Sequence, residues 1–239
     1  GVSELDALLG GGIERGTVTI VTGPAGVGKS TTVTQFLANA ATQGEPALAY
    51  LFEEAIETFV HRSETFGLPV SDLRESGSLF VEEIDALSLS PEEFAHQVRR
   101  QVRDHDVELV AIDGIAGYKS AIKSGEADVA LRRRLRALIQ GLVRTNASVM
   151  LVDQRREVTG FPEPTSESVS HLADNIVFQN YVEDGGELKR VVGVLKKRVG
   201  GFETVPRRFE ITADGLEVGE PASGMHGVFE DIPDRYGAG

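Results

Sequence analysis

The sequence has no cysteine, no apolar run long enough to cross a bilayer, and comparatively few positive charges. The absence of cysteine excludes disulfides, thiolate zinc sites and cysteine nucleophiles. Apolar stretches such as 149–152 are only a few residues long, whereas a membrane-spanning helix needs about 20 apolar residues. Nothing at the N-terminus resembles a signal peptide. We therefore expect a cytoplasmic protein without a membrane span.

Acidic side chains outnumber basic ones by 37 to 24, which gives a formal net charge of −13. This excess disfavours nucleic acid as a partner, because such binding depends on cations that displace counterions from phosphates. The arginine-rich segment 132–136 is interpreted as a solvated or interface face of a helix. The five histidines show no ligand spacing, so they predict no metal site.

The 239 residues, with 41% hydrophobic and 26% charged side chains, have the composition of a folded globular protein. Short β-branched or apolar runs alternate with segments of helical periodicity along most of the chain. Strands are expected at 17–22, 47–52, 78–81, 109–112 and 148–152, and helices at 29–42, 56–66, 91–105 and 128–145. This alternation predicts a mostly parallel central sheet flanked by helices, the α/β class.

The pattern changes near the C-terminus. Segments 175–182, 189–196 and 207–211 are expected to be antiparallel strands, joined through turns at 183–186 and 200–201. We therefore expect one α/β domain with an antiparallel C-terminal edge over residues 1–218. Residues 219–239 are rich in Gly, Pro and acids, which is typical of a tail or linker.

One motif has a specific chemical interpretation. Gly23-Pro-Ala-Gly-Val-Gly-Lys-Ser matches G-x-x-x-x-G-K-[ST] and lies between a predicted strand and a predicted helix, which is the context of a phosphate-binding P-loop. Lys29 would contact the β- and γ-phosphates, and the Ser30 hydroxyl would ligate Mg²⁺. The residues predicted to bind the nucleotide are Gly23, Gly26, Val27, Gly28, Lys29, Ser30 and Thr31, with ATP and Mg²⁺ as the cofactors.

Carboxylates follow two of the predicted strands. Asp113 ends the strand 109–112, where P-loop NTPases place a carboxylate beside magnesium; the alternative is an ordinary turn residue. Glu53 and Glu54 follow the strand 47–52, at the sheet edge where ligands of parallel sheets gather. They can face a γ-phosphate and a water molecule, or they can be solvated acids that open the next helix.

Two basic residues share a face near the end of a predicted edge strand. Lys196 and Arg198 alternate onto one side and Lys197 onto the other. They can pair with phosphates held by a neighbouring subunit, or they can protect the strand edge with charge; the residues alone favour protection. Gln154, just past the fifth strand, can sense a γ-phosphate or cap the strand.

Together these segments resemble a KaiC-type ATPase domain of the RecA superfamily, from Gly1 to about Val218. The resemblance rests on GVSELDALLGGGIERG before the P-loop, on Phe52-Glu53-Glu54, and on 173–177, 194–198 and 209–218. It implies a RecA-like P-loop NTPase fold and a slow ATP hydrolase. It also implies a homo-oligomer, a hexameric ring with ATP at the subunit interfaces.

The resemblance further implies roles for individual residues. Glu53 resembles the residue that activates water, and Glu54 its partner near magnesium. Lys196 and Arg198 resemble a pair that reaches the γ-phosphate of the next subunit, and Thr65 matches a residue near the nucleotide. The expected catalytic residues are Lys29, Glu53, Glu54, Lys196 and Arg198, and the expected magnesium ligands are Ser30, Asp113 and Glu54.

Three functions stay open at this point. The first is a signalling or regulatory ATPase with an unknown protein partner, and the second is an ATP-gated scaffold without significant turnover. The third is a RadA-like recombination accessory ATPase, which would need DNA-binding loops. The segment 155–170 offers only Arg155 and Arg156 before it turns acidic and proline-rich. No adjacent Ser-Thr pair in a matching context supports protein kinase activity, and Thr165-Ser166 has the wrong surroundings.

Overall fold

The computed structural model describes residues 2–85, 88–120, 127–154 and 170–222. Arg155, Arg156 and Thr165-Ser166 lie outside the described residues, as does the predicted tail beyond Ala222. Among the helices of the described segments, none combines the length and the apolar character needed to cross a membrane.

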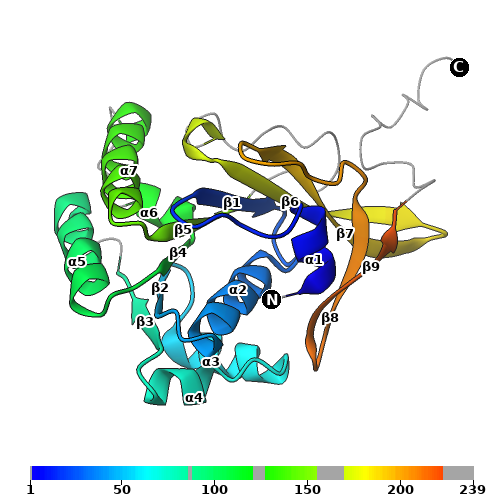
Figure 1. Ribbon diagram of the computed structural model, residues 1–239, viewed down its shortest axis with the longest axis horizontal. Helices are drawn as coiled ribbons and strands as arrows, with labels where there is room; N and C mark the ends of the chain where they lie inside the picture. Colours follow the sequence, from blue (N-terminus) through cyan, green and yellow to red (C-terminus); the bar gives the residue numbers. More distant parts are fainter. Residues whose placement is uncertain (1, 86–87, 121–126, 155–169, 223–239) are drawn as a thin grey trace, which may run out of the picture.

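Within the described residues, nine strands form one sheet in the order β3-β2-β4-β5-β1-β6-β7-β8-β9 (Figure 1). The strands are β1 (Val18–Gly23), β2 (Ala47–Leu51), β3 (Leu79–Glu83), β4 (Leu109–Asp113), β5 (Ser148–Gln154), β6 (Asn175–Asp184), β7 (Glu187–Lys197), β8 (Arg207–Thr212) and β9 (Gly215–Pro221). Strands β1 to β6 pair in parallel, and β6 to β9 pair antiparallel. The predicted mostly parallel sheet with an antiparallel C-terminal edge is confirmed.

Helices cover both faces of the sheet (Figure 1). On one face lie α1 (Ser3–Leu8), α2 (Lys29–Thr42), α3 (Ile56–Thr65) and α4 (Val70–Glu75); on the other lie α5 (Pro91–Asp104), α6 (Ile115–Ser120) and α7 (Ala127–Arg144). Successive strand side chains point to opposite faces, so Val21 packs in the core under α2 while Ile20 packs in the core under α5 and α7. Because both faces are covered, every residue of β1 and β2 is buried.

The hairpin between β6 and β7 is formed by the predicted glycine turn. Asp184 pairs with Glu187, which leaves Gly185 and Gly186 as a two-residue loop. Both glycines have positive φ, +62° and +88°, as the common two-residue hairpin turn with two left-handed positions requires. The turn thus fixes the register of the long antiparallel pair that continues to Lys197.

Three short helices and the last strand were not predicted. The helices α1, α4 and α6 are six residues long, too short to show a helical period. Strand β9 ends at Pro221, so the predicted start of the tail at residue 219 falls within this strand. The tail itself stays a prediction.

Candidate functional site

A cavity of about 600 Å³ opens at the carboxyl ends of the parallel strands. It is bounded by the turn after β1, the residues just after β2 and β4, and the end of β5. Open α/β sheets bind their ligands at this edge, where the strand order reverses. The lining residues are Ala25, Gly26, Gly28, Lys29, Ser30, Thr31, Leu51, Glu53, Glu54, Thr58, Arg62, Phe66, Asp113, Gly114, Ala116, Val152, Gln154, Arg190 and Ile211.

The predicted P-loop forms one wall of this cavity. Gly28 precedes the first residue of α2 with φ at +119°, and a Cβ there would lie 2.6 Å from Ile211 Cδ1; only glycine fits both conditions. Gly23 and Val27 do not line the cavity. Gly23 ends β1 against the backbone carbonyl of Gln179, and Val27 is buried in the core. Gly23 and Val27 therefore support the loop from the protein interior and do not line the cavity.

Lys29 is a buried cation at the base of the cavity. Its side chain is 6% exposed and its Nζ donates a hydrogen bond of 2.6 Å to the Pro24 carbonyl. Burial lowers the pKa of Lys29, and the neighbouring charges of Asp113, Asp153 and Glu53 raise it again. A buried cation attracts an anion that enters the cavity more strongly than an exposed cation does, because little water screens its charge.

Ser30 and Asp113 lie next to each other in the cavity wall. The Ser30 hydroxyl donates a hydrogen bond to the Asp113 carboxylate. Burial raises the pKa of Asp113, whereas the Ser30 hydrogen bond and the charge of Arg62 lower it. No cluster of three or more His, Cys, Asp or Glu side chains suited to a metal occurs in the described segments. A hydroxyl beside one carboxylate fits Mg²⁺, which takes one or two protein carboxylates together with phosphate oxygens.

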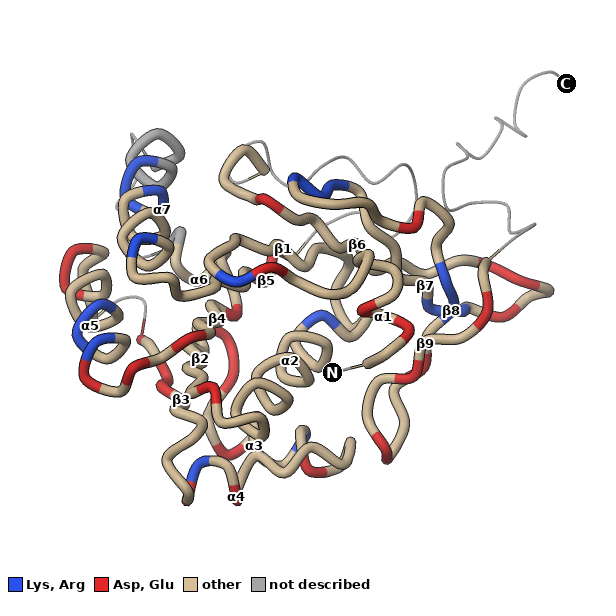
Figure 2. The backbone as a smooth tube through the Cα atoms, viewed as in Figure 1, with Lys and Arg blue, Asp and Glu red and all other residues tan. Residues whose placement is uncertain are grey.

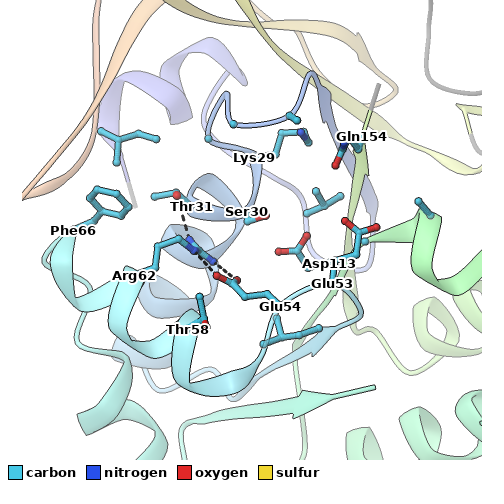
Figure 3. A pocket seen from close by; sticks show the side chains of 18 of the residues that line it. Lys29, Ser30, Thr31, Glu53, Glu54, Thr58, Arg62, Phe66, Asp113 and Gln154 are labelled. Carbon is cyan, nitrogen blue, oxygen red and sulfur yellow. Dashed lines mark hydrogen bonds and ion pairs between the residues drawn. The ribbon is translucent and has the colours of Figure 1, made fainter. Parts of the chain in front are cut away.

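The two adjacent glutamates point in different directions (Figure 3). Glu53 lies beside Asp113, and its side-chain atoms lie 3.0–3.2 Å from the position that a Cβ on Gly114 would take. Glu54 turns toward α3, where both of its oxygens accept hydrogen bonds from Arg62, at 3.0 and 2.8 Å. Glu54 is therefore paired with Arg62, whereas Glu53 packs against Gly114, and the charges of both glutamates act on Asp113.

Lys196 and Arg198 lie away from this cavity. The Lys196 ammonium donates to the Ala173 carbonyl at 2.6 Å, and Arg198 forms an ion pair with Asp174 at 3.0 Å. Lys197 extends to the opposite side, toward the N-terminal segment. The chain therefore does not bring Lys196 and Arg198 to its own P-loop.

Thr65 is not part of the cavity lining either. Its hydroxyl donates to the His61 carbonyl within α3, at 2.9 Å. Its neighbour Phe66 does line the cavity. The structure thus brings the last turn of α3 to the cavity, through a residue other than the predicted one.

The sequence predictions missed several lining residues, among them Thr58, Arg62, Phe66, Arg190 and Ile211. Thr58, Arg62 and Phe66 are spaced four residues apart, so a helix from residue 56 places them on one face. This spacing, counted from the Glu53–Glu54 pair, is a signal that could have found them. Arg190 and Ile211 come from β7 and β8 and have no local signal, because only the sheet order brings them to the P-loop.

Comparisons with known proteins agree with this arrangement. A family model described as "ATPase: KaiC" matches residues 1–223. The chain is 26% identical over 235 residues to the circadian clock oscillator protein KaiC of Thermostichus vulcanus. It is 25% identical over the same length to the circadian clock protein KaiC3 of Synechocystis sp.. Each alignment covers 98% of this chain and 45% of the relative, so the chain spans about half the length of these relatives.

Proposed function

The chain belongs to the KaiC family of ATPases, which have a RecA-like fold, and from this premise we propose that it binds MgATP in the cavity beside the P-loop and hydrolyses it slowly. The observation that carries the proposal is the convergence of Lys29, Ser30, Asp113 and Glu53 on one cavity at the carboxyl edge of the sheet. A phosphate-binding cation, a pair of oxygen ligands for Mg²⁺ and a carboxylate base are the groups that phosphoryl transfer to water requires.

Each of these groups has a distinct task in the proposed reaction. Lys29 and the N–H groups of the P-loop bind the β- and γ-phosphates. Ser30 and Asp113 would hold Mg²⁺; Glu54, the third ligand expected from the sequence, is instead paired with Arg62. When bound, Mg²⁺ offsets the negative charge that develops on the phosphate oxygens.

Glu53 is the proposed general base. Its carboxylate accepts a proton from a water molecule while the water oxygen attacks the γ-phosphorus. The bond from this phosphorus to the oxygen that bridges the β- and γ-phosphates breaks, and ADP and inorganic phosphate leave. Phe66 and Ile211 offer apolar surface at the rim of the cavity, where the base and ribose of a nucleotide extend from the P-loop.

We also propose that catalysis takes place between subunits of a homo-oligomer, a hexameric ring. Lys196 and Arg198 do not line the cavity of their own chain. Arg198 is exposed and so is available to a neighbour, whereas Lys196 would first have to release the Ala173 carbonyl. In this proposal Lys196 and Arg198 are catalytic residues that act on the ATP bound by the neighbouring subunit. A nucleic-acid partner is disfavoured by the net charge, and Figure 2 shows that acidic residues border β2, β3 and β9. A protein partner in the cytoplasm is the expected regulator.

Binding of MgATP to purified chain tests the proposed site. Lys29→Ala removes the cation at the base of the cavity, so affinity for MgATP is expected to fall at least 100-fold. Lys189→Ala is the matched control, because Lys189 lies on the exposed hairpin and does not line the cavity. Equal affinity of the folded Lys29→Ala variant and the wild type, measured by isothermal titration calorimetry, would overturn the proposal.

A further inference from the structure

Arg62 connects three parts of the cavity wall. Its Nε and Nη2 donate to the two oxygens of Glu54, at 3.0 and 2.8 Å, and its Nη1 donates to the Thr31 hydroxyl at 3.2 Å (Figure 3). Glu54 follows β2, Thr31 lies in the first turn of α2, and Arg62 lies on α3. One guanidinium therefore links the segment that carries the glutamates to the helix that begins at the P-loop.

The geometry of this pair is restrictive. Two parallel N–H···O bonds fix both the distance and the plane of a carboxylate, which a single contact does not. The two side chains are 23% and 22% exposed, so they are shielded more than ordinary surface ion pairs. The third donor, to Thr31, limits rotation of the guanidinium itself. Glu54 is thus held in one orientation within the cavity wall.

The charges around the cavity explain why holding Glu54 matters. Three carboxylates, Glu53, Glu54 and Asp113, line a space that is to receive polyphosphate, and the lining cations are Lys29, Arg62 and Arg190. A carboxylate without a partner in this space repels phosphate oxygens and competes with Glu53 for a water molecule. Arg62 removes this competition by neutralising one carboxylate of the three.

We propose that Arg62 is a positioning residue that holds Glu54 against α3 and so leaves Glu53 as the one acid that acts on the water molecule. This inference rests on the proposed ATPase function. It assigns different tasks to two adjacent glutamates and gives α3 a part in catalysis. Arg62 acts through Glu54, without a role of its own on the reacting atoms.

A double-mutant cycle separates action through Glu54 from an independent effect. Arg62→Gln is expected to lower kcat at least 10-fold, with the KM for MgATP changed less than 3-fold. Arg62→Lys, which keeps the charge but not the paired hydrogen bonds, is expected to recover only part of kcat. Adding Arg62→Gln to Glu54→Gln is expected to change kcat less than 2-fold, because the partner is already gone.

A second ion pair in the same chain provides the matched control. Arg207 and Glu203 also form a multiple contact at similar exposures, 24% and 28%: Nε donates to both carboxylate oxygens, at 3.3 and 3.1 Å, and Nη2 donates to one of them at 2.8 Å. This pair does not line the cavity. The same cycle on Arg207→Gln and Glu203→Gln is expected to show coupling in urea unfolding without nucleotide, and no change in kcat.

Three measurements on each variant make every outcome decisive. MgATP affinity is measured by calorimetry, folding by urea unfolding without nucleotide, and turnover as ADP formed. Independent effects of Arg62→Gln and Glu54→Gln, multiplying in the double variant, would overturn the inference, as would wild-type kcat in Arg62→Gln. If Arg62→Gln does not fold, the same comparison is made with Arg62→Lys. Loss of MgATP-dependent turnover in the wild type would instead overturn the proposed function.

Discussion

Gly114 determines where Glu53 can lie, because the two residues meet where β2 and β4 end. Phe52 N donates to the Asp113 carbonyl, so the glutamate that follows is brought against the residue after Asp113. A side chain at position 114 would start 3.0–3.2 Å from the Glu53 side chain, and φ at this position is +95°. Glu53, the proposed base, is therefore positioned by a residue without a side chain.

Gly114→Ala is expected to lower kcat at least 10-fold while MgATP affinity changes less than 3-fold, since the new methyl group displaces Glu53 and leaves the P-loop intact. Gly44→Ala is the control. Gly44 also has positive φ, +83°, but nothing lies within 4 Å of its added Cβ. Both variants should lose about 1–2 kcal/mol of stability from backbone strain. Turnover and urea unfolding check this, and equal kcat in the two variants would contradict it.

Elements with several agreeing local signals were predicted well from the sequence. The helix at Pro91 has a Ser90 cap, proline in its first turn and Glu93 three residues after the cap; the structure shows the complete capping box, with hydrogen bonds of 3.2 and 2.9 Å. The P-loop likewise has a strand, a glycine turn and a helix in sequence order. In both segments the determining contacts lie within a few residues of each other.

Contacts between distant segments could not be predicted in this way. Arg190 reaches the cavity because β7 pairs with β6, which pairs with β1, and nothing near residue 190 encodes that order. The short helix α1 has no side-chain cap and is placed by burial of Leu5 and Leu8. The sequence therefore predicted the chemical groups of the candidate site better than the full set of its walls.

Lys197 holds the N-terminal segment against the end of β7. Its side chain is 2% exposed, and its Nζ donates to the carbonyls of Leu9 and Gly12 and pairs with Glu14 at 2.8 Å. Lys197→Met keeps the apolar chain but removes these contacts, so the free energy of unfolding should fall by about 2–3 kcal/mol. Lys189→Met, on the exposed hairpin of the same strand, should leave stability nearly unchanged. Urea unfolding of both variants measures the two free energies of unfolding. Equal stability of the two variants would contradict the role of Lys197 in holding the N-terminal segment.

Tyr118 on α6 should make stability fall at alkaline pH. Burial raises the pKa of Tyr118 to about 12 from a usual 10.0. The stability that the neutral Tyr118 contributes is therefore fully present below pH 10 and is lost as the pH rises from 10 to 12. At pH 11 the loss from this residue is about 1.4 kcal/mol. Tyr118→Phe should reduce the alkaline loss without lowering stability at pH 8, because the hydroxyl has no hydrogen-bond partner among the described residues. Identical pH profiles in urea unfolding would refute this.

At the scale of the whole molecule, the trans role proposed for Lys196 and Arg198 would link turnover to assembly. Arg198→Ala is expected to bind MgATP nearly normally and to lose turnover, because arginine supplied in trans contributes about 10³–10⁵ to turnover in NTPases that depend on it. Mixing it with Lys29→Ala subunits should restore some activity, since that mixture pairs an intact P-loop with an intact arginine. Full turnover per subunit in a dilute wild-type monomer would refute the trans role.

The most direct test of the central claim measures ADP formed per subunit by the wild type, Lys29→Ala and Glu53→Gln, alongside bound ATP. The wild type is expected to bind and hydrolyse MgATP, and Lys29→Ala to do neither. Glu53→Gln is expected to retain bound ATP while its hydrolysis falls about 100-fold or more, the scale of general-base assistance. Hydrolysis by Glu53→Gln at the wild-type rate, with ATP bound in the same cavity, would contradict the account.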